Sequence, residues 1–204
     1  MCNNLNQLLN NIRQCRVCCD LPEGAALPHE PRPIVRASAK ARVCICGQAP
    51  GTRVQASGIP FTDPSGDRLR DWMGITEVDF YDVSKLAIVP MGFCFPGLNS
   101  KGGDLPPRRE CARLWHENLF ASLPNLKLVV VIGIYAQKWH LGSHNKATLT
   151  ETVRNWRQYL ELNPDLAYLP LPHPSWRNNG WLKRNSWFET EILPFLKKEI
   201  SRLC

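Results

Sequence analysis

Residues 128–132 read Leu-Val-Val-Val-Ile, a run without a polar side chain. Such a short apolar run, rich in β-branched residues, predicts a strand that is buried on both faces of a sheet. Gly133 permits a tight turn into a helix expected over residues 135–140. Shorter strands are expected over residues 42–46, 86–89 and 167–171. Because strands alternate with helices, the sequence predicts an α/β fold with a parallel sheet covered on both faces.

Longer helices are expected around these strands. Apolar residues recur at helical spacing from Leu5 to Ile12 and predict a helix over residues 3–13. Ser65 is a type of residue that caps helices, so a helix is expected from there towards Gly74. Further helices are expected over residues 108–123 and 182–203, and a loop over residues 15–36.

Length and composition suit one packed domain. The chain has 204 residues, of which 44% are hydrophobic and seven are tryptophan. We expect a single domain over residues 1–204, with residues 1–40 supplying a helix and a cysteine-bearing loop packed on it. No apolar run approaches the roughly 20 residues that cross a bilayer, and the polar start Met1-Cys2-Asn3-Asn4 does not resemble a signal peptide. We therefore expect a cytoplasmic monomer without a membrane partner.

The chain is basic, with a formal net charge of +7. Lys and Arg side chains placed on phosphates release counterions, so this charge suits a polyanionic partner such as DNA. Charge alone does not identify that partner, because net charge speaks to association rather than to a site.

The nine cysteines indicate a metal centre better than a disulfide framework, since no secretory signal is present. Cys15-Arg16-Val17-Cys18 is a C-x-x-C pair that can bind one centre, whereas Cys94 and Cys111 are dispersed. One close pair with two dispersed cysteines suits an iron–sulfur cluster, with zinc as the alternative. The alternative is a buried cysteine that only packs in the core, and we expect this role for Cys44 and Cys46 in the first strand. Cys19 adjoins Cys18, so the assignment of this ligand is uncertain by one position in the sequence.

Segment 42–66 joins the first strand to two motifs. The turn Gly47-Gln48-Ala49-Pro50-Gly51 follows the strand, and Phe61 and Asp63 stand just before a helix start. His173 follows the last strand in Leu171-Pro172-His173-Pro174-Ser175. Since parallel strands end at one edge of a sheet, where α/β folds hold ligands, these motifs predict a shared pocket there. Such a pocket would bind a flat, polar ligand and would place a carboxylate of the protein beside it.

The order of these motifs resembles the uracil-DNA glycosylase superfamily, and is most similar to its iron–sulfur branches, families four and five. The order is C-x-x-C, the glycine turn, Gly58-x-Pro-Phe61, two further cysteines, the valine-rich strand and His173-Pro-Ser175. The resemblance extends from Cys15 to the closing helix. It implies a three-layer α/β/α sandwich around a four-stranded parallel sheet, a 4Fe-4S cluster, and hydrolysis of the N-glycosidic bond of a deaminated base in DNA.

The resemblance also assigns roles to residues of the pocket. Phe61 matches the ring that stacks on the extruded base, and His173 matches the histidine that donates to the base carbonyl as negative charge grows. Backbone groups of Gln48 and Ala49 would line the same pocket. Asn99 matches an asparagine of both branches, and either contacts the base or the DNA backbone or is an ordinary turn residue. A weaker correspondence places Ser84 near a base-reading polar residue.

The expected catalytic carboxylate is Asp63. Family four places an acid directly after the first glycine of the turn, where this chain has Gln48. Family five has Phe-Thr-Gly-Asp, and this chain reads Phe61-Thr62-Asp63, one glycine shorter. The alternative for Asp63 is an acid at a helix N-terminus, and Asp67 is a weaker candidate that could cap the helix.

The DNA contacts are expected after the histidine. Ser175, Trp176 and Arg177 combine a hydroxyl, an aromatic ring and a cation, which suits a loop that wedges into a duplex and holds phosphates. The alternative is a solvated helix start with the tryptophan packed inward.

The resemblance thus implies a base-excision glycosylase for uracil in DNA. The alternative is a related glycosylase for another deaminated base, such as hypoxanthine, since the sequence does not set the width or donor pattern of the pocket. A catalytically weak DNA-binding member of the fold is the third possibility, and Gln48 in place of an acid supports it.

Overall fold

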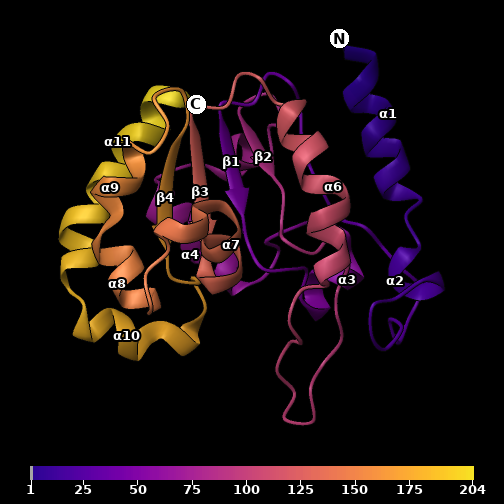
Figure 1. Cartoon of the computed structure of the whole chain (residues 1–204). Helices are drawn as coiled ribbons and strands as arrows, with labels where there is room; N and C mark the ends of the chain where they lie inside the picture. Colours follow the sequence, from indigo (N-terminus) through magenta and orange to yellow (C-terminus); the bar gives the residue numbers. More distant parts are fainter. Residues whose placement is uncertain (1) are drawn as a thin grey trace.

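The computed structural model describes residues 2–204, and the side chains from residue 5 onward. Its centre is a four-stranded sheet in the order β2-β1-β3-β4, in which every neighbouring pair is parallel. The strands are β1 (Val43–Cys46), β2 (Leu86–Ile88), β3 (Leu128–Ile132) and β4 (Ala167–Leu171). The α/β class and the four-stranded parallel sheet are therefore confirmed (Figure 1).

Successive residues of each strand point into two different cores. Cys44 and Cys46 are fully buried on the face that is covered by α1 (Cys2–Arg13), α6 (Arg109–Ala121) and α7 (Gly133–Leu141). Val43 and Ile45 are buried on the face that is covered mainly by α4 (Pro64–Met73) and α11 (Leu193–Leu203). Helices α6 and α11 accordingly lie on opposite sides of the strands (Figure 1). The sheet is the middle of three layers, and the core position expected for Cys44 and Cys46 is confirmed.

Short elements complete the chain and connect the layers. The short α-helices are α2 (Val17–Asp20), α3 (Thr52–Ser57), α5 (Glu77–Phe80), α8 (Leu149–Arg154), α9 (Trp156–Leu160) and α10 (Asn179–Arg184). One-turn 3₁₀ segments are η1 (Gly142–His144) and η2 (Trp176–Asn178). In the described part of the chain, no helix has the length and apolar character needed to cross a membrane.

The expectation of one closing helix over residues 182–203 is wrong. The chain forms α10, then a π-helical turn η3 (Phe188–Ile192), then α11. Asn185 leaves helical geometry at φ −128° and ψ 55°, and its side-chain amide donates to the carbonyl of Trp181 at 2.8 Å. Pro194 lacks the N–H that would continue a regular ladder into the preceding turn. The segment that periodicity alone reads as continuous is thus divided at Asn185, and its helical hydrogen bonding changes from π to α where α11 begins.

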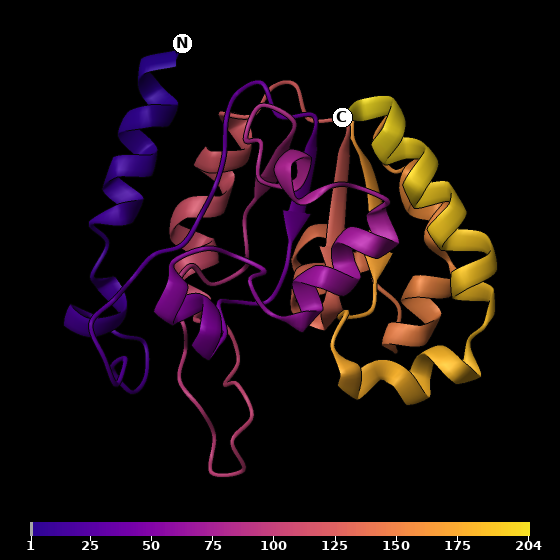
Figure 2. The same cartoon turned by 180° about the vertical axis from the view of Figure 1, so that it is seen from behind.

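The carboxyl ends of the strands meet at one edge of the sheet. The turn after β1 and the segments after β2 and β4 start from that edge. A long loop between β2 and α6 projects from it, and α10 lies at the same end of the molecule (Figures 1 and 2). This edge therefore collects the motifs that the sequence singled out.

Candidate active site and cysteine cluster

A pocket lies at the carboxyl edge of the sheet, between the turn after β1 and the segments that follow β2 and β4. The structure brings together in it most of the residues predicted to bind and process a base. Among its lining residues are Gly47, Gln48, Ala49, Phe61, Asp63, Pro90, Asp104 and His173.

Phe61 has an unusual backbone conformation in this pocket. It has φ +58°, and it is the one non-glycine residue with positive φ in the described part of the chain. Its ring lies over the turn, since a Cβ added to Gly47 would stand 3.6 Å from the ring atom Cζ. The other side is supported by Phe80, whose ring meets it edge-on with centroids 5.9 Å apart. A left-handed phenylalanine costs on the order of 1–3 kcal/mol, so the surrounding structure has to hold it.

Three neighbours hold the backbone of Phe61. The hydroxyl of Tyr81 donates to the carbonyl of Pro60 at 2.8 Å and to that of Phe61 at 3.3 Å. The Arg70 guanidinium donates to the same Phe61 carbonyl at 3.3 Å. Gly66 lets this carbonyl approach, because a Cβ there would lie 1.8 Å from the oxygen. These contacts hold Phe61 where a stacking ring was expected, and the sequence did not reveal them.

Asp63 is the N-cap of α4. Its Oδ1 accepts a hydrogen bond from the backbone N–H of Gly66 at 3.1 Å, and Pro64 occupies the first turn. The expectation that Ser65 caps this helix is wrong, because the N-cap is Asp63 and the helix begins at Pro64. Asp63 is half-buried and also lines the pocket, so the capping position and the pocket wall coincide in one side chain.

His173 follows β4 and points to the same pocket. Its carbonyl accepts from the side-chain amide of Asn178 at 2.7 Å, which anchors the loop. Burial lowers the pKa of His173, and the carboxylates of Asp63 and Asp104 partly oppose that shift. A lowered pKa favours the neutral imidazole at pH 7, which can still donate one hydrogen bond to a ligand.

Asp104 was missed by the sequence reasoning. It lies on the projecting loop, where it forms a bridge with Leu98, and its carboxylate reaches over the turn after β1. A Cβ added to Gly51 would be 3.6 Å from its Oδ2. The signal in the sequence was weak, because Gly102-Gly103-Asp104 reads as an ordinary loop and nothing in it says where the loop folds. Only the tertiary structure places this acid at the pocket.

A wider groove continues from the pocket across the surface. It is lined by Ser175, Trp176 and Arg177, together with Arg53 and Asn99. The Trp176 side chain is 71% exposed, with the Arg177 guanidinium 5.8 Å from its ring centre. The inward-packed alternative for Trp176 is therefore wrong, and the aromatic–basic surface expected for DNA is exposed beside the pocket.

Two of the expected base-reading residues lie elsewhere. Ser84 stands before β2, at the amino edge of the sheet, and its hydroxyl donates to Asp82 at 2.7 Å. Its assignment to the base pocket is wrong, because parallel strands place that edge opposite the pocket. Asn99 lies in the groove rather than the pocket, and its Oδ1 accepts from the backbone N–H groups of Lys101 and Gly103. Asn99 thus has the turn role that was one of its two expectations.

Comparison with known families agrees with this geometry. The family model described as the uracil DNA glycosylase superfamily matches residues 35–197. The chain belongs to the uracil DNA glycosylase superfamily. The matched range includes all four strands and the pocket, but it begins after Cys15 and Cys18. The match therefore shows the superfamily and does not assign the chain to one of its branches.

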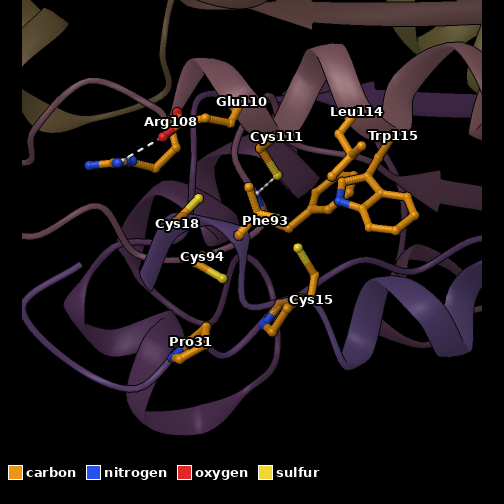
Figure 3. A pocket seen from close by; sticks show the side chains of 12 residues that line it. Cys15, Cys18, Pro31, Phe93, Cys94, Arg108, Glu110, Cys111, Leu114 and Trp115 are labelled. Atoms are coloured by element: carbon orange, nitrogen blue, oxygen red, sulfur yellow. Dashed lines mark hydrogen bonds and ion pairs between the residues drawn. The ribbon is translucent and has the colours of Figure 1, made fainter. Parts of the chain in front are cut away.

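The four predicted metal-ligand cysteines of this superfamily member face one hollow (Figure 3). They come from three regions of the chain: the segment from α1 into α2, the segment after β2, and the first turn of α6. The four are Cys15, Cys18, Cys94 and Cys111. Cys19 does not line the hollow, and its thiol donates to the carbonyl of His29 at 3.7 Å. The packing thus selects Cys18 over its neighbour.

The thiols of this hollow form one donor set. Cysteine thiolates ligate both zinc ions and iron–sulfur clusters, so these four residues suit either kind of centre. The backbone N–H of Phe93 donates to Cys111 Sγ at 3.3 Å, the type of bond that tunes cluster ligands.

The surroundings of the hollow are mostly buried. Burial raises the pKa of Cys94 to about 12 and also raises that of Cys111. Thiols in such a site ionise when a bound cation compensates the thiolate charge. Arg108 and Glu110 form an ion pair of 2.8 Å at the border of the hollow. Four thiols at a mostly buried hollow are thus the feature of this region that a thiolate-bound metal centre would use.

Proposed function

We propose that this protein is a DNA glycosylase that removes uracil from DNA and so starts base-excision repair. The observation that carries the proposal is the pocket of a uracil DNA glycosylase superfamily chain in which a held aromatic ring, a histidine and carboxylates meet. Such a pocket offers a flat stacking surface, a donor for the polar edge of a base, and negative charge near the sugar.

In the proposed reaction the damaged nucleotide leaves the duplex and its base stacks on Phe61. His173 donates a hydrogen bond to the base carbonyl, where negative charge grows as the glycosidic bond breaks. Backbone groups of Gln48 and Ala49 contact the base. The carboxylate of Asp63 stabilises the positive charge that develops on the sugar.

The DNA surface is proposed to be the groove beside the pocket. The exposed ring of Trp176 can wedge against the duplex, while Arg177 and Arg53 neutralise phosphates. Ser175 accepts from the backbone N–H of Arg177 at 3.1 Å and so orders the loop that contacts the backbone of the DNA.

The cysteines are proposed to hold a 4Fe-4S cluster, with Cys15, Cys18, Cys94 and Cys111 as its ligands. When bound, the cluster supplies a cross-link between distant segments rather than a reacting group. Cys15 and Cys18 lie in the N-terminal part of the chain, and Cys94 precedes the loop that carries Asp104. The ligands therefore tie the N-terminal segment to the base of that loop.

A DNA-binding member with weak catalysis is the second candidate, because Gln48 stands where one related family has an acid and Asp63 serves as a helix cap. The test incubates the protein with single-stranded and double-stranded oligonucleotides that contain uracil or hypoxanthine, followed by alkaline cleavage of abasic sites. We expect cleavage at uracil. Cleavage only at hypoxanthine would reassign the substrate, and tight binding without base release would favour the second candidate.

A further inference from the structure

The loop that carries Asp104 has an internal structure of its own. Leu98 and Asp104 face each other across an antiparallel bridge, and the N–H of Leu105 donates to the carbonyl of Gly97 at 2.9 Å. The Asn99 side chain closes the tip by accepting from two backbone N–H groups. Gly102, at φ +74°, supplies the left-handed turn. The loop is thus a small hairpin that projects from the carboxyl edge (Figure 2).

The root of this hairpin is attached to the glycine turn. The side-chain amide of Gln48 donates to the carbonyl of Leu105 at 3.3 Å. This bond joins the residue directly after Gly47 to the residue directly after Asp104. Gly51, at the far end of the turn, leaves open the space that the Asp104 carboxylate approaches. Gln48 therefore orients the hairpin so that its acid stands over the pocket.

The charges around Asp104 are those of a reacting site. Its carboxylate faces the Arg177 guanidinium, the imidazole of His173 and the carboxylate of Asp63. Partial burial raises the pKa of Asp104, the repulsion of Asp63 adds to that shift, and Arg177 and His173 oppose it. A carboxylate with a raised pKa is a stronger base while it is still ionised near neutral pH. Asp63 differs, because one of its oxygens already accepts the cap hydrogen bond.

We propose that Asp104 is a catalytic carboxylate of this site and that Gln48 is its positioning residue. The inference rests on the proposed glycosylase function and deepens it. Asp104 accepts a proton from the attacking water as the water oxygen forms a bond to C1′ of the sugar. The bond from C1′ to the base nitrogen breaks, and its electron pair leaves with the base, stabilised by His173. The base then takes up one proton, so that one water is consumed for each base released.

The experiment measures single-turnover base release from a uracil-containing oligonucleotide at saturating protein. Binding is measured separately on DNA that carries a tetrahydrofuran abasic analogue. We expect Asp104→Asn to slow base release at least 100-fold and to change the dissociation constant less than threefold. Asp165→Asn is the matched control, because Asp165 is an exposed acid just before β4, at the opposite edge of the sheet.

Gln48→Leu keeps the acid and removes the bond to Leu105. For a positioning residue we expect base release to slow about tenfold with unchanged binding of the abasic analogue, and Gln48→Leu to add little slowing when combined with Asp104→Asn. Base release by Asp104→Asn within threefold of the wild type would overturn the inference and leave the proposed function standing. A wild type that releases no base from any substrate would overturn both.

Discussion

Tyr81→Phe tests whether the strained backbone of Phe61 is held by the tyrosine hydroxyl. The substitution removes the bonds of 2.8 Å to the Pro60 carbonyl and 3.3 Å to the Phe61 carbonyl and leaves the ring in place. A buried hydrogen bond contributes about 1 kcal/mol net, and a long second bond contributes less. The loss is therefore roughly 1–1.5 kcal/mol, of the same order as the cost of a left-handed phenylalanine.

That loss acts on the population of the conformer that can stack a base. About 1.4 kcal/mol corresponds to about a tenfold change in an equilibrium constant. We expect kcat/KM for base release to fall by up to about tenfold in Tyr81→Phe, mostly through KM, because binding selects the remaining competent molecules. The free energy of unfolding should fall by about 1 kcal/mol. Base release is followed with a uracil-containing oligonucleotide, and unfolding with urea.

Tyr159→Phe provides a matched control. The Tyr159 hydroxyl donates to the carbonyl of His144 at 3.2 Å, and its side chain is buried and does not line the pocket. The control should lose a similar amount of stability and keep its kcat/KM. If Tyr81→Phe loses stability to the same extent as the control but keeps kcat/KM within twofold of the wild type, the tyrosine does not position Phe61 and the reasoning is refuted.

Three further predictions concern the cysteines, the DNA surface and a buried histidine. Cys18→Ser should lose the iron and sulfide of anaerobically purified protein, whereas Cys19→Ser should keep them; stoichiometric zinc in the wild type would contradict a cluster. Arg177→Ala should reduce the slope of log binding constant against log salt by about 1, while Arg202→Ala, whose side chain pairs with Glu199, should not change it. Burial lowers the pKa of His116 to about 4, so its contribution to stability is complete above its unfolded pKa near 6.5 and declines as the pH falls towards 4. Between pH 7.5 and pH 5 the free energy of unfolding, measured with urea, should therefore fall by about 2 kcal/mol less in His116→Phe than in the wild type. An equal fall in the two proteins would exclude His116 as the titrating group.

The strands and most of the pocket motifs could be predicted because their signals are local. An apolar run such as residues 128–132 is buried in the middle of a sheet. Residues directly after parallel strands lie at the same edge of the sheet. Helix boundaries were less predictable. The helix expected over residues 182–203 breaks at Asn185, because a local cap there outweighs the apolar period.

The candidate site divides in the same way. Phe61 and His173 follow from motifs close to strand ends. Spacing could not place Ser84 correctly. A residue just before a parallel strand lies at the opposite edge of the sheet from a residue just after it. Asp104 could not be found at all, because its loop meets the turn after β1, for example through the Gln48–Leu105 hydrogen bond, across segments distant in the chain.

The α/β class, the parallel sheet and the edge of the sheet that carries the pocket thus follow from the order of residues, because apolar periodicity and strand-end motifs depend on neighbours in the chain. The three-dimensional packing selects which cysteine of the adjacent pair faces the hollow, what holds Phe61 in a left-handed conformation, and which second acid reaches the pocket. Each of these depends on contacts between segments far apart in sequence, where small differences in packing select one arrangement. The carboxylates at the pocket show both kinds of control, since Asp63 is placed by its own helix and Asp104 by a loop attached to the Gly47 turn.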